Sequence, residues 1–101
     1  MSAGAPRASA QSPDLEAVVV LEGGKLMLYL DRYASNEPLA DAQVEIESGA
    51  IKAHAARIAP GVFAAEAGAL ASPGKHALTL VVQAGELNDL LTVTLEVAPV
   101  S

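Results

Sequence analysis

The sequence predicts an all-β fold, a two-layer sandwich of about seven short antiparallel strands. Three observations support this prediction. Apolar and polar residues alternate within short segments, which is the period of a half-buried strand. Turn-forming glycine and proline residues separate these segments at roughly eight to twelve residues, a spacing typical of sandwiches. No long segment places its apolar residues at the spacing of an amphipathic helix face.

The pattern begins with two strands that a tight turn joins. The segment LEAVVVLE, residues 15–22, is rich in β-branched valine and ends at a Gly-Gly pair. Such a pair accepts the positive φ angles of a two-residue hairpin. The segment KLMLYLD, residues 25–31, then places its three leucines on one face and Met27 and Tyr29 on the other.

The clearest alternation lies in AQVEIES, residues 42–48, where Val44 and Ile46 point inward between outward-facing polar residues. The next segment, AIKAHAARI, fits both a strand and a short helix, because alanine favours helix and its apolar residues also match a helix face. We favour the strand, since Gly49 and Pro60 confine this segment to a length typical of strands.

Three further strand segments complete the pattern, and Pro-Gly turns precede the first two of them. They are VFAAEAGAL (62–70), which runs into a loop, KHALTLVVQ (75–83) and LLTVTLEV (90–97). A polar connection is expected over residues 83–89. Strands of this number and spacing are those of an immunoglobulin-like β-sandwich, although the Cys-Trp-Cys hallmark of antibody domains is absent.

The chain has 101 residues, the size of one domain. Residues 15–98 form the predicted sandwich domain. Residues 1–14 consist mainly of alanine, serine, glycine and proline, and we expect a flexible leader or linker there. Residues 99–101 are a tail. The leader lacks the apolar region of a signal peptide, so we expect a soluble chain, either cytoplasmic or part of an exported protein.

Composition argues against several kinds of partner and chemistry. The formal net charge is −6, and such a surface repels nucleic acid and anionic bilayers. The absence of cysteine excludes disulfides, thiolate nucleophiles and thiolate metal sites. The longest apolar run, residues 17–21, is far too short to span a bilayer.

His54, His76 and Met27 are the candidate metal ligands. None belongs to a closely spaced His-x-His or His-x-x-x-His pair, which is the pattern that predicts a metal site. Both histidines are expected on the solvent side of their strands, so we interpret them as ordinary surface residues. The alternative is weak binding of a divalent or monovalent cation with the help of a neighbouring glutamate.

No catalytic motif accompanies the carboxylates and serines. Glu45 and Glu47 share one strand face, but nothing apolar nearby would desolvate them for acid–base chemistry. No nucleophile elbow surrounds any serine, and no glycine pattern forms a phosphate loop. We therefore predict that the protein is not an enzyme and uses no cofactor.

The loop over residues 31–42 is rich in residues that shape turns through bonds to nearby backbone amides. We interpret it as a connection that crosses from one sheet to the other, with Leu39 and Ala42 tucked into the core. A protein partner is predicted to bind either an exposed edge strand or the polar side chains of this loop. These residues are Asp31, Ser35, Asn36, Glu37 and Asp41.

Three segments resemble a known family: GGKLMLYLDRYASNEPLADAQVEIESG (23–49), APGVFAAEAGALASPGKHALTLVV (59–82) and DLLTVTLEV (89–97). The pattern includes an apolar strand that ends in Leu-Asp, an Asn-x-Pro-Leu-x-x-Ala loop and a Pro-Gly-Lys-His turn. It resembles an immunoglobulin-like module of periplasmic adaptor subunits, the membrane fusion proteins of resistance–nodulation–division heavy-metal efflux pumps. The loop element is also similar to transthyretin-like and carboxypeptidase-regulatory β-sandwiches.

The resemblance implies a periplasmic location within a longer, exported, inner-membrane-associated protein. It also implies a non-catalytic role as an interaction or spacer module in transport, with other adaptor domains and pump components as partners. The metal-handling role of some such adaptors is not carried over to any residue here. The alternative is a small-ligand or metal-binding β-sandwich in which His54 or His76 binds a cation weakly.

Overall fold

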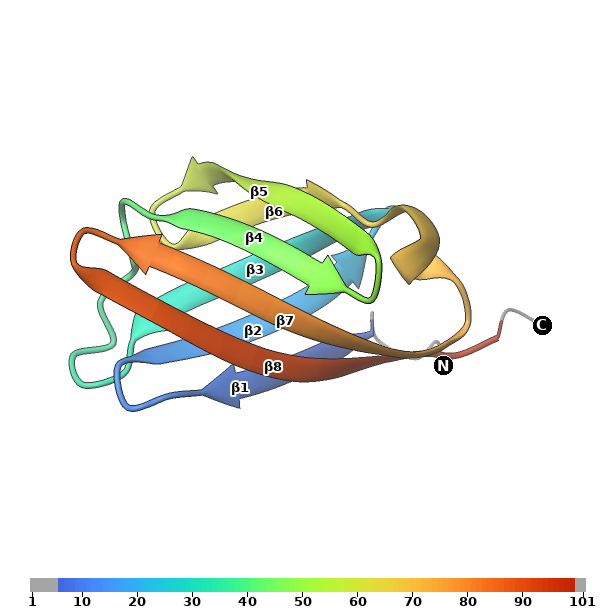
Figure 1. The fold of residues 1–101 in the computed structure, drawn as a ribbon, viewed down its shortest axis with the longest axis horizontal. Coiled ribbons are helices and arrows are strands. Elements are labelled where there is room, and N and C mark those ends of the chain that lie inside the picture. The colour runs from blue at the N-terminus through green and yellow to red at the C-terminus, as the bar shows by residue number, and fades with distance from the viewer. Residues whose placement is uncertain (1–5, 100–101) are drawn as a thin grey trace.

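The structure, a computed structural model, describes residues 6–99, which contain eight strands and one short 3₁₀ helix (Figure 1). The first four strands are β1 (Arg7–Gln11), β2 (Leu15–Glu22), β3 (Lys25–Arg32) and β4 (Gln43–Ser48). The others are β5 (Ile51–Ala59), β6 (Val62–Glu66), β7 (Gly74–Ala84) and β8 (Leu87–Val97). The helix η1 (Gly68–Ala71) lies between β6 and β7.

All eight strands pair antiparallel in one sheet, in the order β1-β2-β3-β6-β5-β4-β7-β8. The sheet folds over on itself, so that β4, β7 and β8 lie in front of β2, β3 and β6 in Figure 1. The strand β5 belongs to both layers, because residues 51–55 pair with β4 and residues 56–59 pair with β6. β1 and β8 lie side by side, and the sheet is nearly barrel-shaped. The predicted all-β antiparallel fold is confirmed.

The core lies between the two layers and consists of aliphatic side chains and Phe63, the one buried aromatic residue among those described. Alternate residues of β2, β3, β4, β7 and β8 supply it, as the period of two requires. Each leucine or phenylalanine that is fully buried stabilises the fold by about 1.5–3 kcal/mol. No polar or charged side chain of residues 6–99 is buried.

Several local predictions are confirmed. The Gly-Gly pair forms a two-residue turn, because Glu22 pairs directly with Lys25. The ambiguous segment after Gly49 is the strand β5. The segment that begins at Val62 is a five-residue strand, and the loop expected after it contains the single turn of η1.

The predicted flexible leader is wrong for residues 7–11, which form β1 and pair with β2 along their whole length. Ala8 and Ala10 pack against the core from this strand. The segment gave no strand signal because it contains no β-branched or aromatic residue, whereas the ladder to β2 depends on the backbone. Residues 1–5 of the leader and residues 100 and 101 of the tail lie outside the described residues.

The polar connection expected over residues 83–89 is also wrong. The strands β7 and β8 pair as far as Ala84 and Leu87, and only Gly85 and Glu86 form the turn. Gly85 has a φ of 62°, which suits the first position of a two-residue hairpin turn. The polar residues Gln83, Asn88 and Asp89 lie in the strands next to the turn of this hairpin, and their polarity suggested a longer loop.

Candidate functional site

The loop after β3 is a small hairpin that leaves the end of the strand and returns alongside it. Arg32 N–H donates to the Glu37 carbonyl oxygen at 2.8 Å, and Asn36 N–H donates to the Arg32 carbonyl oxygen at 2.8 Å. Asp31 pairs with Pro38 as an isolated antiparallel bridge. Asn36 has a φ of 59°, a left-handed conformation that asparagine tolerates better than most residues. The backbone therefore fixes the shape of this loop.

Two backbone hydrogen bonds hold the base of the loop to the turn between β5 and β6, and a third joins the two ends of the loop. Leu30 N–H donates to the Gly61 carbonyl oxygen at 2.8 Å, and Gly61 N–H donates to the Leu39 carbonyl oxygen at 3.1 Å. Leu39 N–H donates to the Leu30 carbonyl oxygen at 2.9 Å, which closes the set. Leu39 is buried in the core, as predicted, while Ala42 is half-buried. The loop then leads to β4 in the other layer, so it makes the expected crossing.

The tip of the loop touches the turn between β1 and β2. Tyr33 N–H donates to the Asp14 carbonyl oxygen at 3.0 Å, while Tyr33 as a whole remains 46% exposed. Ser12, in the same turn, donates its hydroxyl to the Asp89 carboxylate at the start of β8. The Ser12 oxygen also accepts the Leu15 N–H at 3.0 Å. These contacts tie the loop tip, the β1–β2 turn and β8 together at one end of the molecule.

The five predicted contact residues of this loop differ in exposure. Ser35, Asn36, Glu37 and Asp41 are exposed, and Asp31 is half-buried. The Ser35 hydroxyl oxygen accepts the Glu37 N–H at 3.4 Å, the turn-shaping bond expected of serine in a loop. Glu37 therefore presents its carboxylate from a backbone that hydrogen bonds hold, and Asp41 presents an exposed carboxylate two residues beyond the buried Leu39.

The two histidines lie in different environments. His54 is exposed on the outer face of β5, opposite Glu45 of β4, as predicted. His76 is half-buried and pairs with the buried Leu95, so it belongs to the inward-facing row of β7. The prediction that His76 faces solvent is therefore wrong, because His76 lies two residues before the buried Leu78 and shares its face of the strand. Its Nε2 atom lies 2.7 Å from the Ser72 carbonyl oxygen.

The arrangement of these side chains does not bring metal ligands together. Met27 is half-buried in the middle of β3, apart from both histidines in the strand pairing. Among residues 6–99, no three histidine, aspartate or glutamate side chains are grouped so that they could hold a metal ion. Of the glutamate pair on β4, Glu45 is exposed and Glu47 lies 4.0 Å from Lys52 in a surface ion pair. These residues form a solvated sheet face.

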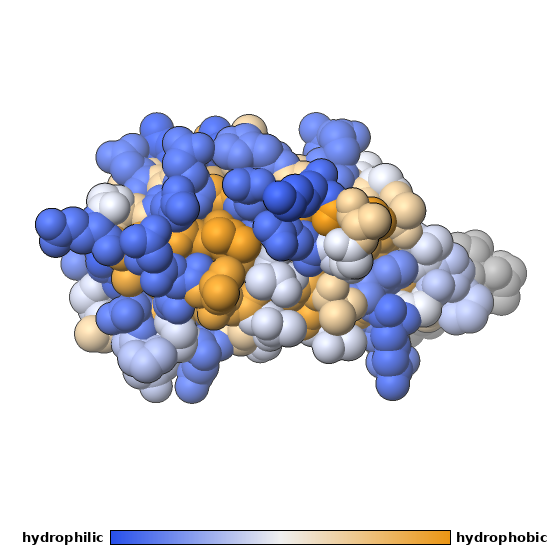
Figure 2. Space-filling view, viewed as in Figure 1, coloured by the Kyte–Doolittle hydropathy of each residue, from blue (hydrophilic) through white to orange (hydrophobic). Residues whose placement is uncertain are grey.

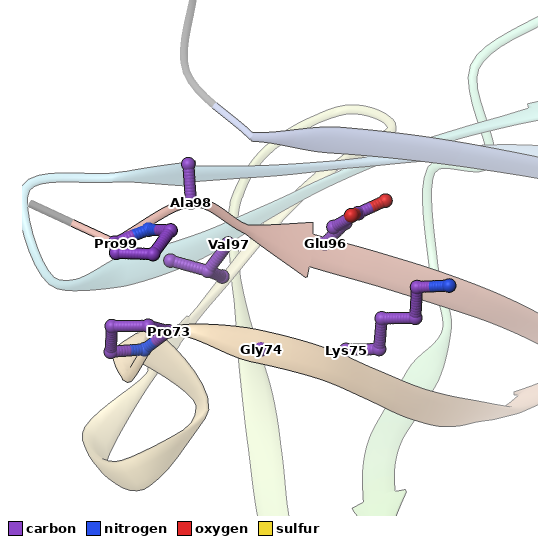
Figure 3. A pocket seen from close by; sticks show the side chains of 7 residues that line it. All are labelled: Pro73, Gly74, Lys75, Glu96, Val97, Ala98 and Pro99. Atoms are coloured by element: carbon purple, nitrogen blue, oxygen red, sulfur yellow. The ribbon is translucent and has the colours of Figure 1, made fainter.

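An open hollow of about 730 Å³ lies at the opposite end of the molecule (Figure 3). Pro73, just before β7, and Pro99, two residues after the end of β8, border the hollow. Val97, the last residue of β8, lies beside them. Lys75 and Glu96, neighbours across the two strands, supply its charged groups. These two side chains have opposite charges, so the lining has no net charge that would attract an ionic ligand.

The outer face of β2, β3 and β6 carries a surface that sequence reasoning missed. Side chains between the buried positions of these strands point away from the core, yet most of them are apolar. We call this surface the outer band, and it comprises Val18, Val20, Met27, Tyr29, Val62 and Ala64. The signal was the unbroken apolar run over residues 17–21, since a strand that is apolar throughout is apolar on both faces.

The chain matches no protein-family model, no curated protein sequence and no solved structure. Within residues 6–99, no helix has both the length and the apolar character needed to cross a membrane.

Proposed function

We propose that this chain is a non-catalytic interaction or spacer module of a periplasmic efflux-pump adaptor and acts through protein–protein contact. The observation that carries the proposal is the fixed loop between Arg32 and Leu39. Backbone hydrogen bonds hold both its base and its tip, while its polar side chains remain exposed. A loop that is already ordered loses little conformational entropy when a partner binds, so its contacts translate into affinity.

The residues that carry the resemblance to adaptor modules also support this proposal. The Asn-x-Pro-Leu element supplies Asn36 with its positive φ, Pro38 against Gly61, and the buried Leu39. Gly61 belongs to the segment 59–82, the second segment that resembles adaptor modules. It contacts Pro38 and Leu39 of the first segment, so two distant parts of the pattern meet at the base of this loop. The pattern is therefore tied to the conformation of this loop.

Binding to pump components tests the interaction role. The transporter and channel proteins encoded beside the gene are immobilised, and the affinity of the chain is measured by biolayer interferometry. We expect the double variant Glu37→Lys, Asp41→Lys to bind at least tenfold more weakly, because two exposed carboxylates of the loop are reversed. The control is Glu45→Lys, Glu47→Lys, which makes the same change of charge on β4. Unaltered binding by the loop variant, or equal weakening by both, contradicts the proposal.

The adaptor assignment has a separate test in the full-length reading frame. We expect segments for a helical hairpin and a lipoyl-like domain beside this module, and a transporter gene nearby. Finding a different set of domains and neighbours contradicts the assignment but leaves the interaction role to the binding experiment.

A further inference from the structure

We propose that the outer band binds a basic amphipathic segment of a partner protein. This inference rests on the proposed interaction role and goes beyond it by naming a second surface and the chemistry of its partner. The band consists of two cross-strand rows, Val18–Tyr29–Val62 and Val20–Met27–Ala64. Every member is at least partly exposed, and Tyr29 is 38% exposed, although this face has no second layer above it in the structure.

The band continues into a groove at the point where β5 departs from β6. The groove holds about 280 Å³, and its apolar lining residues include Ala56, Ile58 and Ala64. Lys25, His54 and Glu66 also line it. Ile58 is 59% exposed, which is unusual for so large an apolar side chain. An apolar surface with an adjoining hollow can accept both the body of a segment and one of its side chains.

Carboxylates border the band on both sides along the strands. Glu16 and Asp31 face each other directly across β2 and β3 at one border, and like charges in this position repel. Neither takes part in an ion pair among the described residues. At the other border, Glu22 pairs with Lys25, whose Nζ atom lies 3.6 Å from a Glu66 carboxylate oxygen. Arg7 of β1 also lies on this outer face, beside Val20. The surroundings of the band thus hold four carboxylates, those of Glu16, Glu22, Asp31 and Glu66, against the two cations Arg7 and Lys25, so negative charge exceeds positive charge.

The negative charge around the outer band indicates which kind of partner binds there. A lysine or arginine of a partner would relieve the repulsion between Glu16 and Asp31 while apolar side chains cover the band. A second copy of the chain has the same acidic border and a net charge of −6, so its approach is opposed by electrostatic repulsion. Charge complementarity thus favours a basic amphipathic segment over self-association.

The opposite outer face provides an internal control. The side chains of β4, β7 and β8 that face solvent are mainly polar or charged around a central apolar area (Figure 2). That area includes Val81 and Leu90, which are neighbours across β7 and β8, and Leu90 is 64% exposed. Variants of this pair alter an outward apolar surface without touching the outer band.

The test uses a synthetic peptide of leucine and lysine with helical amphipathic spacing, titrated into the ¹⁵N-labelled full chain and followed by NMR. A peptide with glutamate in place of lysine is the control ligand. We expect saturable shifts centred on residues 16–20, 27–31 and 62–64 with the lysine peptide, and at least tenfold weaker binding of the glutamate peptide. Shifts spread over both faces, or equal binding of the two peptides, overturn the proposal.

Matched variants separate the two elements of recognition. We expect Val18→Thr with Val62→Thr to weaken binding of the lysine peptide at least tenfold, and Val81→Thr with Leu90→Thr to change it less than twofold. We also expect Glu16→Gln with Asp31→Asn to weaken it at least threefold, and Glu45→Gln with Glu47→Gln to have less effect. The spectra report whether each variant is folded. An equal effect of either variant and its control overturns the proposal.

Two further measurements distinguish the remaining outcomes. If light scattering shows a concentration-dependent dimer that Val18→Thr with Val62→Thr abolishes, the occupant is a second copy and the proposal fails. The loop variant Glu37→Lys, Asp41→Lys is expected to retain at least half of the peptide affinity. Failure of the outer band is therefore distinguishable from failure of the loop.

Discussion

Gly61 lies so close to Pro38 that a β-carbon on the glycine would stand 2.8 Å from the Pro38 Cβ atom. The same β-carbon would lie 3.0 Å from the Leu30 carbonyl oxygen, which accepts a hydrogen bond from Leu39. Gly61 also has a φ of 76°, a conformation that strains other residues. The turn between β5 and β6 and the crossing loop thus fit together only because this position is glycine.

Replacing this glycine is expected to destabilise the domain. Gly61→Ala adds both backbone strain and overpacking, so we expect the free energy of unfolding to fall by about 2–4 kcal/mol. Urea denaturation followed by circular dichroism measures the change. The matched control is Gly49→Ala, whose φ is also positive but whose new β-carbon meets nothing within 4 Å. We expect it to cost about 1 kcal/mol, and equal losses for the two variants would show that the contact with Pro38 is unimportant.

Asn36 offers a test of the loop conformation itself. Asn36→Gly is expected to leave the free energy of unfolding within about 0.5 kcal/mol, because glycine adopts a positive φ without strain. Asn36→Ala is expected to cost about 1 kcal/mol, since a β-carbon disfavours that conformation. Thermal and urea unfolding of both variants measure the difference. A destabilisation by glycine as large as that by alanine would mean that the asparagine side chain, rather than its φ angle, holds the loop.

Much of the fold was predictable because its strands alternate between core and solvent. The inward rows of β3, β4 and β8, such as Val44 and Ile46, follow this period closely. Two failures share a physical cause. β1 is held by its ladder to β2 and by small side chains, and His76 occupies an inward position at a strand end where the core gives way to solvent. Neither leaves a strong trace in hydrophobicity.

The candidate surfaces were predictable to different degrees. The loop after β3 stood out because its turn-forming residues interrupt a clear alternation, and Leu39 and Ala42 were expected to return to the core. The outer band did not stand out, because it requires three strands to be set side by side. Val18, Tyr29 and Val62 are far apart in the chain and become one row only through the pairing of β2, β3 and β6.

The strand β1 is expected to be as rigid as the strands of the core. We expect ¹⁵N relaxation to give order parameters of about 0.85 for residues 7–11, the value of a rigid backbone. The physical reason is the continuous pairing of this strand with β2 and the contact of Ala8 and Ala10 with the core. Residues 26–30 of β3 provide the internal reference. Order parameters below about 0.6 at Ala8 and Ala10 would mean that this segment is flexible, as its composition predicts.

Metal titration tests the alternative of a cation-binding sandwich. We expect no saturable NMR shifts at His54, His76 or Met27 with micromolar Zn²⁺, Cu⁺, Ag⁺ or Ni²⁺, because β5, β7 and β3 hold these residues apart. His54 has Glu45 as its cross-strand neighbour, and one imidazole with one carboxylate gives only weak affinity. His54→Gln and His76→Gln serve as controls for nonspecific shifts. Saturable shifts at micromolar metal that either substitution removes would favour metal binding over the interaction role.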